Sequence, residues 1–204
     1  MLKAKPFIKW VGGKSQLIEQ LEAQLPADFD NWKNVTYIEP FVGGGAMLFY
    51  MLQRYPHIRR AIINDINPDL CTCYRTVRDM PEQLIKALYE VERTYLSLNT
   101  EEDRKSYFMS VREHYNEKKL NAIENTTLFF FLNRTCFNGL YRVNKKGLFN
   151  VPFGKYANPT ICDPGTIRKD SELLQQVEIL NEDFEVTFDY AHGNTLFYFD
   201  PPYR

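Results

Sequence analysis

The first third of the chain alternates between helical and extended patterns of apolar residues. Four apolar residues of segment 14–25 share one helical face, and Pro26 ends the run: Leu17, Ile18, Leu21 and Leu25. Residues 35–42 predict a strand, residues 46–55 a helix that stops before Pro56, and residues 59–65 a second strand. This order indicates a parallel sheet with a right-handed crossover.

The middle of the chain has a different pattern. From about residue 70 to residue 135 it is mostly helical, and Thr100–Asp103 predicts a capping box. Residues 140–154 predict a β-hairpin around Asn144–Gly147. No acidic residue lies between Glu124 and Asp163, whereas five cations do: Arg134, Arg142, Lys145, Lys146 and Lys155.

The alternation of helix and strand resumes after this basic stretch. Asp163 and Pro164 are typical of the N-cap and first position of a helix. Residues 177–181 and 195–200 then predict two further strands. We therefore predict an α/β domain that is interrupted by a basic insert.

Composition narrows the classes of protein. The 204 residues are 44% hydrophobic and 25% charged with a net charge of −1, so any surface for nucleic acid must be local. No segment resembles a signal peptide, and the longest apolar run, residues 128–132, is too short to span a bilayer. The four cysteines and three histidines lack metal-ligand spacing. We expect a cytoplasmic protein with reduced thiols and no metal.

Each of the four predicted strands is followed by an acidic residue: Glu39, Asp65, Asp183 and Asp200. In an open parallel sheet, ligands bind outside the carboxyl ends of the strands. Acids are common at strand ends and chance could supply one, but four at the same edge favour a binding pocket.

The segment "FVGGGA", residues 41–46, lies between a predicted strand and a predicted helix. Its glycines would let the backbone approach a ligand closely, and Asp65 would suit the hydroxyls of a ribose. The dinucleotide pattern G-x-G-x-x-G is broken because its third glycine falls on Leu48. The glycines indicate a nucleoside-like ligand, although a structural turn alone would also explain them.

The segment "WVGGKS", residues 10–15, is not a P-loop, because Ile8 stands where the first glycine is required. Lys14 lies at a predicted helix start beside Trp10. An aromatic face can hold a sulfonium cation by the attraction that holds ammonium. Packing in the core is the alternative for Trp10.

The segment "DPPY", residues 200–203, is the most specific motif. An exocyclic base amine is a poor nucleophile because its lone pair is delocalised into the ring. The Asp200 carboxylate and the Pro201 carbonyl could accept its two N–H bonds, held rigid by Pro201 and Pro202. Tyr203 would stack on the base, which must leave the duplex to reach this corner.

These motifs together resemble the DNA adenine-N6 methyltransferases of the Dam and DpnII-methylase kind (D12 class, α group). The matching segments are "PFIKWVGGK", "YIEPFVGGGA", "NDINPDL", "FLNRTCFNGLYRVNKKGLFNVPFGKY" and "DPPY", in that order. They span essentially the whole chain. The resemblance implies a Rossmann-like methyltransferase sheet, residues 1–70 and 163–204, with a helical and β-hairpin target-recognition insert, residues 71–162. It also implies that strands after residue 204 complete the sheet.

The resemblance implies S-adenosylmethionine as methyl donor and double-stranded DNA as partner. The cofactor-binding residues would be Trp10, Lys14, Phe41, Asp65, Asp183, Phe184 and Asp200. The catalytic residues would be Asp200, Pro201, Pro202 and Tyr203. The DNA-binding residues would be Lys9, Phe137, Arg142 and Asn144.

The expected reaction is direct methylation of adenine N6 after base flipping, with GATC as the expected sequence. Methylation of cytosine C5 is disfavoured because no cysteine follows a proline. Two alternatives stay open: an inactive or truncated DNA-binding relative of the same fold, and an NAD-dependent oxidoreductase built on the same strand–helix–strand unit. A cognate restriction endonuclease is a possible functional partner.

Overall fold

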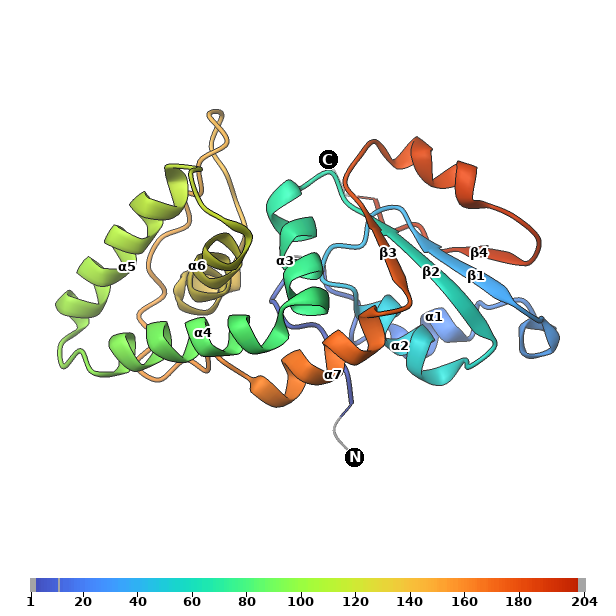
Figure 1. The fold of residues 1–204 in the computed structure, drawn as a ribbon, viewed down its shortest axis with the longest axis horizontal. Coiled ribbons are helices and arrows are strands. Elements are labelled where there is room, and N and C mark those ends of the chain that lie inside the picture. The colour runs from blue at the N-terminus through green and yellow to red at the C-terminus, as the bar shows by residue number, and fades with distance from the viewer. Residues whose placement is uncertain (1–2, 11, 202–204) are drawn as a thin grey trace.

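A parallel four-stranded sheet forms one side of the molecule, and a group of helices forms the other (Figure 1). The computed structural model describes residues 3–10 and 12–201. The strand order is β3-β2-β1-β4, and every neighbouring pair is parallel. The elements in chain order are α1 (Ile18–Glu22), η1 (Phe29–Asn31), β1 (Val35–Glu39), α2 (Ala46–Arg54), β2 (Ile58–Asn64), α3 (Pro68–Asp79), α4 (Pro81–Leu96), α5 (Glu101–Asn116), α6 (Ala122–Thr135), η2 (Phe137–Gly139), α7 (Pro164–Leu174), β3 (Val177–Leu180), η3 (Phe184–Tyr190) and β4 (Thr195–Phe197).

The predicted α/β class is confirmed, because a central parallel sheet is flanked by helices. The chain leaves the sheet after β2 and returns to it at β3, which pairs directly with β2. Helices α3 to α7 therefore all belong to the connection between two strands that are neighbours in the sheet. In Figure 1, α4, α5 and α6 stand away from the sheet, with α3 and α7 between them and the strands.

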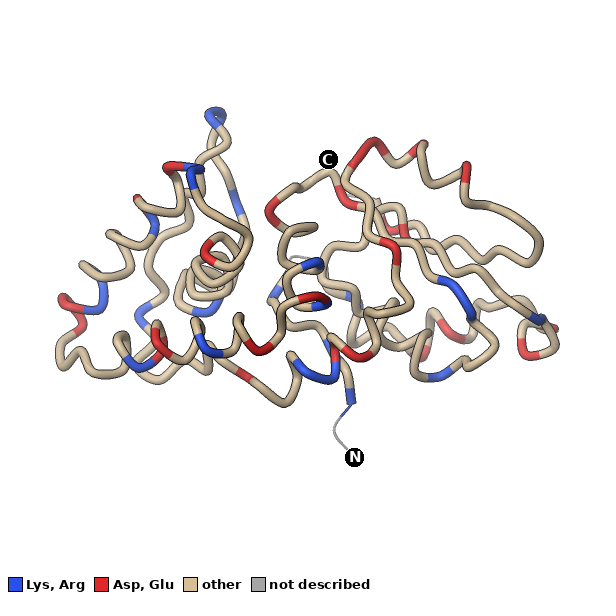
Figure 2. Tube along the Cα trace, viewed as in Figure 1, with Lys and Arg blue, Asp and Glu red and all other residues tan. Residues whose placement is uncertain are grey.

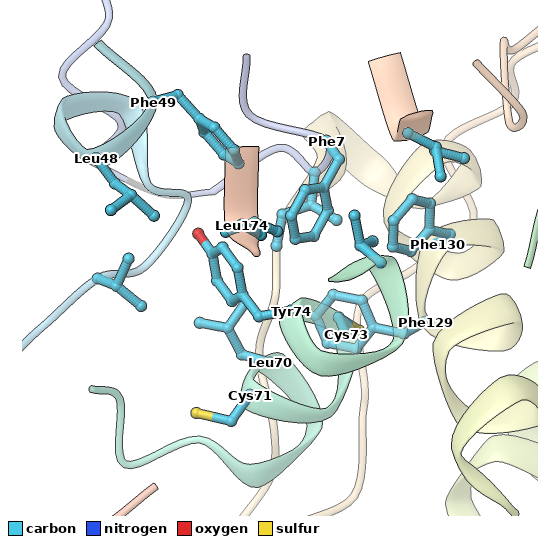
Figure 3. Close-up of a cluster of buried hydrophobic side chains, with 14 of the residues drawn as sticks. Phe7, Leu48, Phe49, Leu70, Cys71, Cys73, Tyr74, Phe129, Phe130 and Leu174 are labelled. Carbon is cyan, nitrogen blue, oxygen red and sulfur yellow. The ribbon is translucent and has the colours of Figure 1, made fainter. Parts of the chain in front are cut away.

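One continuous core joins the sheet to the helices of the insert. Phe7 stacks on Phe130 of α6 at a centroid distance of 5.4 Å and meets Tyr74 of α3 edge-on at 4.9 Å. It also contacts Phe49 of α2 at 6.2 Å, as Figure 3 shows. The predicted boundary between residues 70 and 71 therefore falls in the first turn of α3, a helix that packs both on the part with the sheet and on the insert. The division into a catalytic part and an insert stays a prediction.

Local signals account for most helix ends. Asn67 caps α3, and its side-chain oxygen accepts from the backbone N–H groups of Asp69 and Leu70. Asp163 caps α7 ahead of Pro164, as predicted. Thr100 caps α5 as predicted, but Asp103 bonds the Thr100 hydroxyl instead of completing a capping box. A complete capping box, which the sequence analysis missed, starts α6 at Asn121.

Three predicted elements are shorter in the structure. The helix predicted over 14–25 is reduced to α1, because Leu17 offers no side-chain cap and Lys14 is drawn into other contacts. The strand predicted over 35–42 ends at Glu39, where Pro40 removes a donor from the ladder. The strand predicted over 195–200 ends at Phe197, although the Tyr198 N–H still donates to Ile38.

The predicted β-hairpin of residues 140–154 is irregular. Its only ladder contacts among the described residues are the isolated antiparallel bridges Val143–Phe149 and Cys136–Phe153. The turn itself is well defined, because the Asn144 N–H donates to Leu148 and the Gly147 N–H donates to Asn144. The predicted turn is confirmed, and the two arms of the hairpin pair through isolated bridges without forming regular strands.

Candidate functional site

The carboxyl ends of the four strands open into a cleft of about 840 Å³. A volume of this size is typical of sites for small molecules and cofactors. Glu39, Asp65, Asp183 and Asp200 all line it, one from the end of each strand. The sequence predicted that these four acids meet at one edge, and the structure confirms it.

Asp200 and Lys14 form an ion pair inside the cleft. The Lys14 ammonium lies 2.8 Å from Asp200 Oδ1, and the two side chains are only 18% and 23% exposed. Lys14 also donates to the Gly12 carbonyl at 3.0 Å. Lys14 therefore lies in a turn before α1, not at the predicted helix start. Pro201 lines the cleft, whereas the predicted catalytic residues Pro202 and Tyr203 lie outside the described residues.

Glu39 is a buried carboxyl in the cleft wall. The Tyr37 hydroxyl donates to Glu39 Oε1 at 2.6 Å, and Glu39 is 1% exposed. Burial raises the pKa of Glu39 to about 8, with a further increase from the charge of Asp200. The sequence analysis noted Glu39 at a strand end but did not place it among the binding residues.

Asp65 is fixed by the backbone around it. Its Oδ2 accepts from the Gly43 N–H at 3.1 Å, and its Oδ1 accepts from the Asn67 N–H at 2.9 Å. Burial raises the pKa of Asp65, and these two hydrogen bonds oppose that change. Each carboxylate oxygen has a second acceptor site. Asp65 can therefore hold the glycine turn and still accept from the hydroxyls of a ribose.

The glycine turn makes room for an aromatic side chain. A Cβ atom at Gly43 would lie 2.8 Å from Trp10 Cδ1, and one at Gly44 would lie 3.0 Å from Trp10 Cβ. Gly43 to Gly45 also line the cleft. The close approach that the sequence predicted for a ligand is therefore used, at least in part, by Trp10.

Apolar side chains form another part of the cleft wall. The rings of Phe41 and Phe184 lie 5.3 Å apart and are tilted by 34°. Ile66 lines the same cleft and is 74% exposed, which is unusual for an isoleucine. The sequence analysis missed Ile66, whose position directly after the strand-end acid Asp65 was the available signal. Asp183 caps η3 by accepting from the Glu185 N–H.

Trp10 combines the two roles that the sequence left open. Its indole stacks on Tyr141 at 5.4 Å with an interplanar angle of 21°, and on Phe129 at 6.5 Å. Trp10 and Tyr141 also line the cleft. Trp10 is thus packed against the core while part of it faces the site. Tyr141 was missed by the sequence analysis.

Lys9 and Phe137, two predicted DNA-binding residues, are brought into one region by Asn133. The Asn133 carboxamide accepts from the Lys9 N–H and donates to the Lys9 carbonyl, both at 2.8 Å. It also donates to Gly139, which follows Phe137 in the turn η2 and lies against the Lys9 side chain. Phe137 itself is 52% exposed.

Arg142 and Asn144 lie on the segment that projects from the insert, gold to orange in Figure 1. Arg142 donates from Nε to Asn150 Oδ1 at 2.8 Å. Asn144 Oδ1 accepts from the backbone N–H groups of Lys146 and Leu148, so this oxygen holds the turn. Lys145 and Lys146 are exposed at the tip, which is blue in Figure 2.

Two other cations of the basic stretch have structural partners. Arg134 donates to the Phe7 carbonyl at 2.7 Å, and burial lowers its pKa. Lys155 pairs with Glu101 at 2.9 Å. The exposed basic surface of this stretch therefore centres on the segment that contains Arg142, Lys145 and Lys146.

Within residues 3–10 and 12–201, no group of three or more His, Cys, Asp or Glu side chains is arranged to hold a metal ion. The same described part of the chain has no helix that is long and apolar enough to cross a membrane.

Fold and site together define an α/β protein with a cleft for a ligand at the carboxyl edge of its parallel sheet. Residues 10–204 match the family profile described as "D12 class N6 adenine-specific DNA methyltransferase". The chain belongs to this family of adenine-specific DNA methyltransferases, and membership implies a methyl donor. The comparison confirms the resemblance and decides against the NAD-dependent oxidoreductase.

Three relatives illustrate the similarity. The Type II methyltransferase M.MjaIII of Methanocaldococcus jannaschii is 46% identical, over 100% of this chain and 70% of its own length. The Type II methyltransferase M1.LlaDCHI of Lactococcus lactis subsp. cremoris is 37% identical, over 99% of this chain and 66% of its own. A DNA adenine methylase of Vibrio cholerae is 32% identical, over 100% of this chain and 66% of its own. The chain thus spans about two thirds of the length of these relatives.

Proposed function

We propose that this protein transfers a methyl group from S-adenosylmethionine to adenine N6 in duplex DNA. The observation that carries the proposal is the cleft at the strand ends. It is lined by four acidic residues, and one of them, Asp200, pairs with Lys14 and directly precedes Pro201. The names of the relatives, DNA adenine methylase and Type II methyltransferase, support the same chemistry.

The lining of the cleft fits the cofactor. Asp65 has acceptor capacity for the ribose hydroxyls, and Ile66 with Phe184 offers apolar surface for an adenine ring. Asp183 lines the same cleft and would accept from the amino group of that ring, and Phe41 lies beside Phe184. The Asp200 carboxylate and the indole of Trp10 can balance the positive charges of an ammonium and a sulfonium group. The bound cofactor supplies an electrophilic methyl group on a sulfonium.

Asp200 and Pro201 bind and orient the target amine. The Asp200 carboxylate has a second oxygen besides the one that accepts from Lys14, and it can accept one N6–H bond while the Pro201 carbonyl accepts the other. These acceptors favour a pyramidal nitrogen with a localised lone pair. Transfer of the methyl group to N6 would place positive charge on this nitrogen, and the Asp200 carboxylate would stabilise it. The surplus proton then leaves to solvent by way of Asp200.

The base must be flipped out of the duplex to reach this corner. Phe137 is 52% exposed, and its ring would fill the space that the adenine vacates. Pro202 would rigidify the corner and Tyr203 would stack on the flipped base, as the resemblance implies. Arg142 and Asn144 would read bases next to the target, and GATC is the proposed sequence. A cognate restriction endonuclease would be a functional partner.

Transfer of tritiated methyl groups to duplex oligonucleotides tests the proposal. The protein expressed from its full reading frame should label a GATC duplex, whereas Asp200→Ala should abolish labelling but still bind DNA. A matched duplex with the same bases in permuted order is the control for sequence. Binding of DNA by the unaltered protein without any methyl transfer would instead favour an inactive DNA-binding relative. Equal labelling of both duplexes would refute GATC and leave the chemistry standing.

A further inference from the structure

Tyr141 is the one residue of the insert, among the described residues, that lines the cofactor cleft. The other lining residues come from residues 6–67 or from residues 182–201. The insert that carries the predicted DNA-binding residues therefore reaches the cleft through this single side chain. Tyr141 is also the chain neighbour of Arg142.

The ring of Tyr141 packs against two other aromatic rings, which also contact each other at 6.5 Å. It stacks on Trp10 at 5.4 Å and 21°, and on Phe129 of α6 at 5.3 Å and 27°. Phe149 meets it from the far side of the projecting segment at 6.0 Å. Trp10 in turn is wedged against the glycine turn, where a Cβ at Gly43 would collide with it. A shift of the indole cannot leave the tyrosine ring unaffected, because closely packed rings transmit displacement.

The hydroxyl of Tyr141 lies against a second connection to the cleft. It is 3.4 Å from Asp69 Oδ2, which also accepts from the Tyr115 hydroxyl at 2.6 Å and from Lys118 at 2.7 Å. Burial raises the pKa of Tyr141 to about 12, so the hydroxyl stays protonated. Asp69 lies in the first turn of α3, two residues after the cap Asn67 that binds Asp65.

Contacts therefore run from the cleft to the projecting segment by two routes that meet at one residue. The first runs from the glycine turn through Trp10 to Tyr141. The second runs from Asp65 through the start of α3 to Tyr141. From Tyr141 the backbone passes directly to Arg142, whose side chain is bonded to Asn150 across the segment.

We propose that Tyr141 is a positioning residue that couples occupation of the cofactor cleft to the placement of the DNA-reading segment 142–150. Stacking of its ring on Trp10 carries the effect. The inference rests on the proposed function, because it requires that the cleft binds the cofactor and that the segment binds DNA. Coupling of this kind is reciprocal, so DNA should also change the surroundings of Trp10.

A thermodynamic cycle tests this coupling. The affinity for a fluorescent GATC duplex is measured with and without S-adenosylhomocysteine, which occupies the cleft without turnover. The unaltered protein should bind the duplex at least about fivefold more tightly with the nucleoside, the lower end of typical coupling. Tyr141→Phe keeps the ring and should keep this factor, whereas Tyr141→Leu should reduce it to less than about twofold. Tyr107→Leu is the matched control, since Tyr107 is a half-buried insert tyrosine that packs on Phe131 and does not line the cleft.

A second measurement leaves Tyr141 intact. Trp10 and Trp32 are the two tryptophans of the 204 residues, so Trp32→Phe removes the other tryptophan of this chain, and any tryptophan outside these residues is also changed to Phe. Adding the GATC duplex without nucleoside should change Trp10 emission. An unchanged emission on a saturated complex, wild-type coupling in folded Tyr141→Leu, or equal loss in Tyr107→Leu would overturn the inference. Failure of the unaltered protein to bind nucleoside or DNA would instead defeat the proposed function.

Discussion

Gly45 is the glycine of the cleft wall at which an added methyl group should destabilise the fold most. Gly45 has a φ of +71°, and a Cβ atom there would lie 2.5 Å from the Tyr74 hydroxyl oxygen. The left-handed conformation costs an alanine about 1–2 kcal/mol, and overpacking a core costs about 1–3 kcal/mol more. We therefore expect Gly45→Ala to lower the free energy of unfolding by about 2–5 kcal/mol.

Gly147 provides a matched control for the backbone part of this cost. It has a φ of +73°, but no heavy atom of the described residues lies within 4 Å of the Cβ that an alanine would add. Gly147→Ala should therefore cost only about 1–2 kcal/mol. The difference between the two variants isolates the collision with Tyr74.

A double-mutant cycle identifies the atom responsible. In the unaltered protein, Tyr74→Phe removes the hydrogen bond to the Gly43 carbonyl, of length 3.0 Å, and should destabilise by about 0.5–1.5 kcal/mol. In the Gly45→Ala background the same change should stabilise, because the next ring atom, Cζ, lies 3.5 Å from the new Cβ. Urea unfolding followed by circular dichroism measures all the variants. Equal losses for Gly45→Ala and Gly147→Ala, or additive effects in the cycle, would refute the reasoning.

Three further predictions concern charge. Lys14→Met removes a charged hydrogen bond to Asp200, of length 2.8 Å, and should weaken S-adenosylmethionine binding on the order of tenfold, as measured by calorimetry; unchanged affinity would contradict it. Arg142→Ala should reduce the discrimination between base pairs at a guanine-bearing position by about 1–3 kcal/mol, whereas Lys145→Ala should weaken binding to all duplexes alike. Competition binding at two salt concentrations distinguishes these two effects. Burial raises the pKa of Asp170 to about 8. Between pH of about 4 and 8, the native state therefore holds a proton that the unfolded chain has lost, and the free energy of unfolding should fall as pH rises through this range. Asp170→Asn should flatten that decline in urea unfolding at pH 5.5 and 7.5, and an unchanged slope would show that Asp170 does not cause it.

The sequence by itself determined the order of the strands and helices of the sheet domain along the chain, and the edge of the sheet at which the acids meet. Apolar periodicity and the prolines at helix ends, Pro56 and Pro164, are local signals, so β1, α2, β2 and α7 lie close to their predicted positions. Since all strands of a parallel sheet point the same way, the acids after them had to share an edge, and the cleft lies there. The motif "DPPY" and the glycine turn then indicated the family, which the comparison confirms.

Only the tertiary structure decided which side chains from distant segments complete the site. Asn133 holds Lys9 across 124 positions of sequence, and Tyr141 reaches the cleft by stacking on Trp10. Neither contact has a local signature, because each depends on how α6 packs against the N-terminal segment. The shortened α1 and the irregular segment 140–154 have the same cause. Lys14, before α1, pairs with the distant Asp200, and the Asn144 side chain bonds to the turn of its own segment. These tertiary and turn contacts contribute more free energy than the local preference for helix or strand, and they therefore override it.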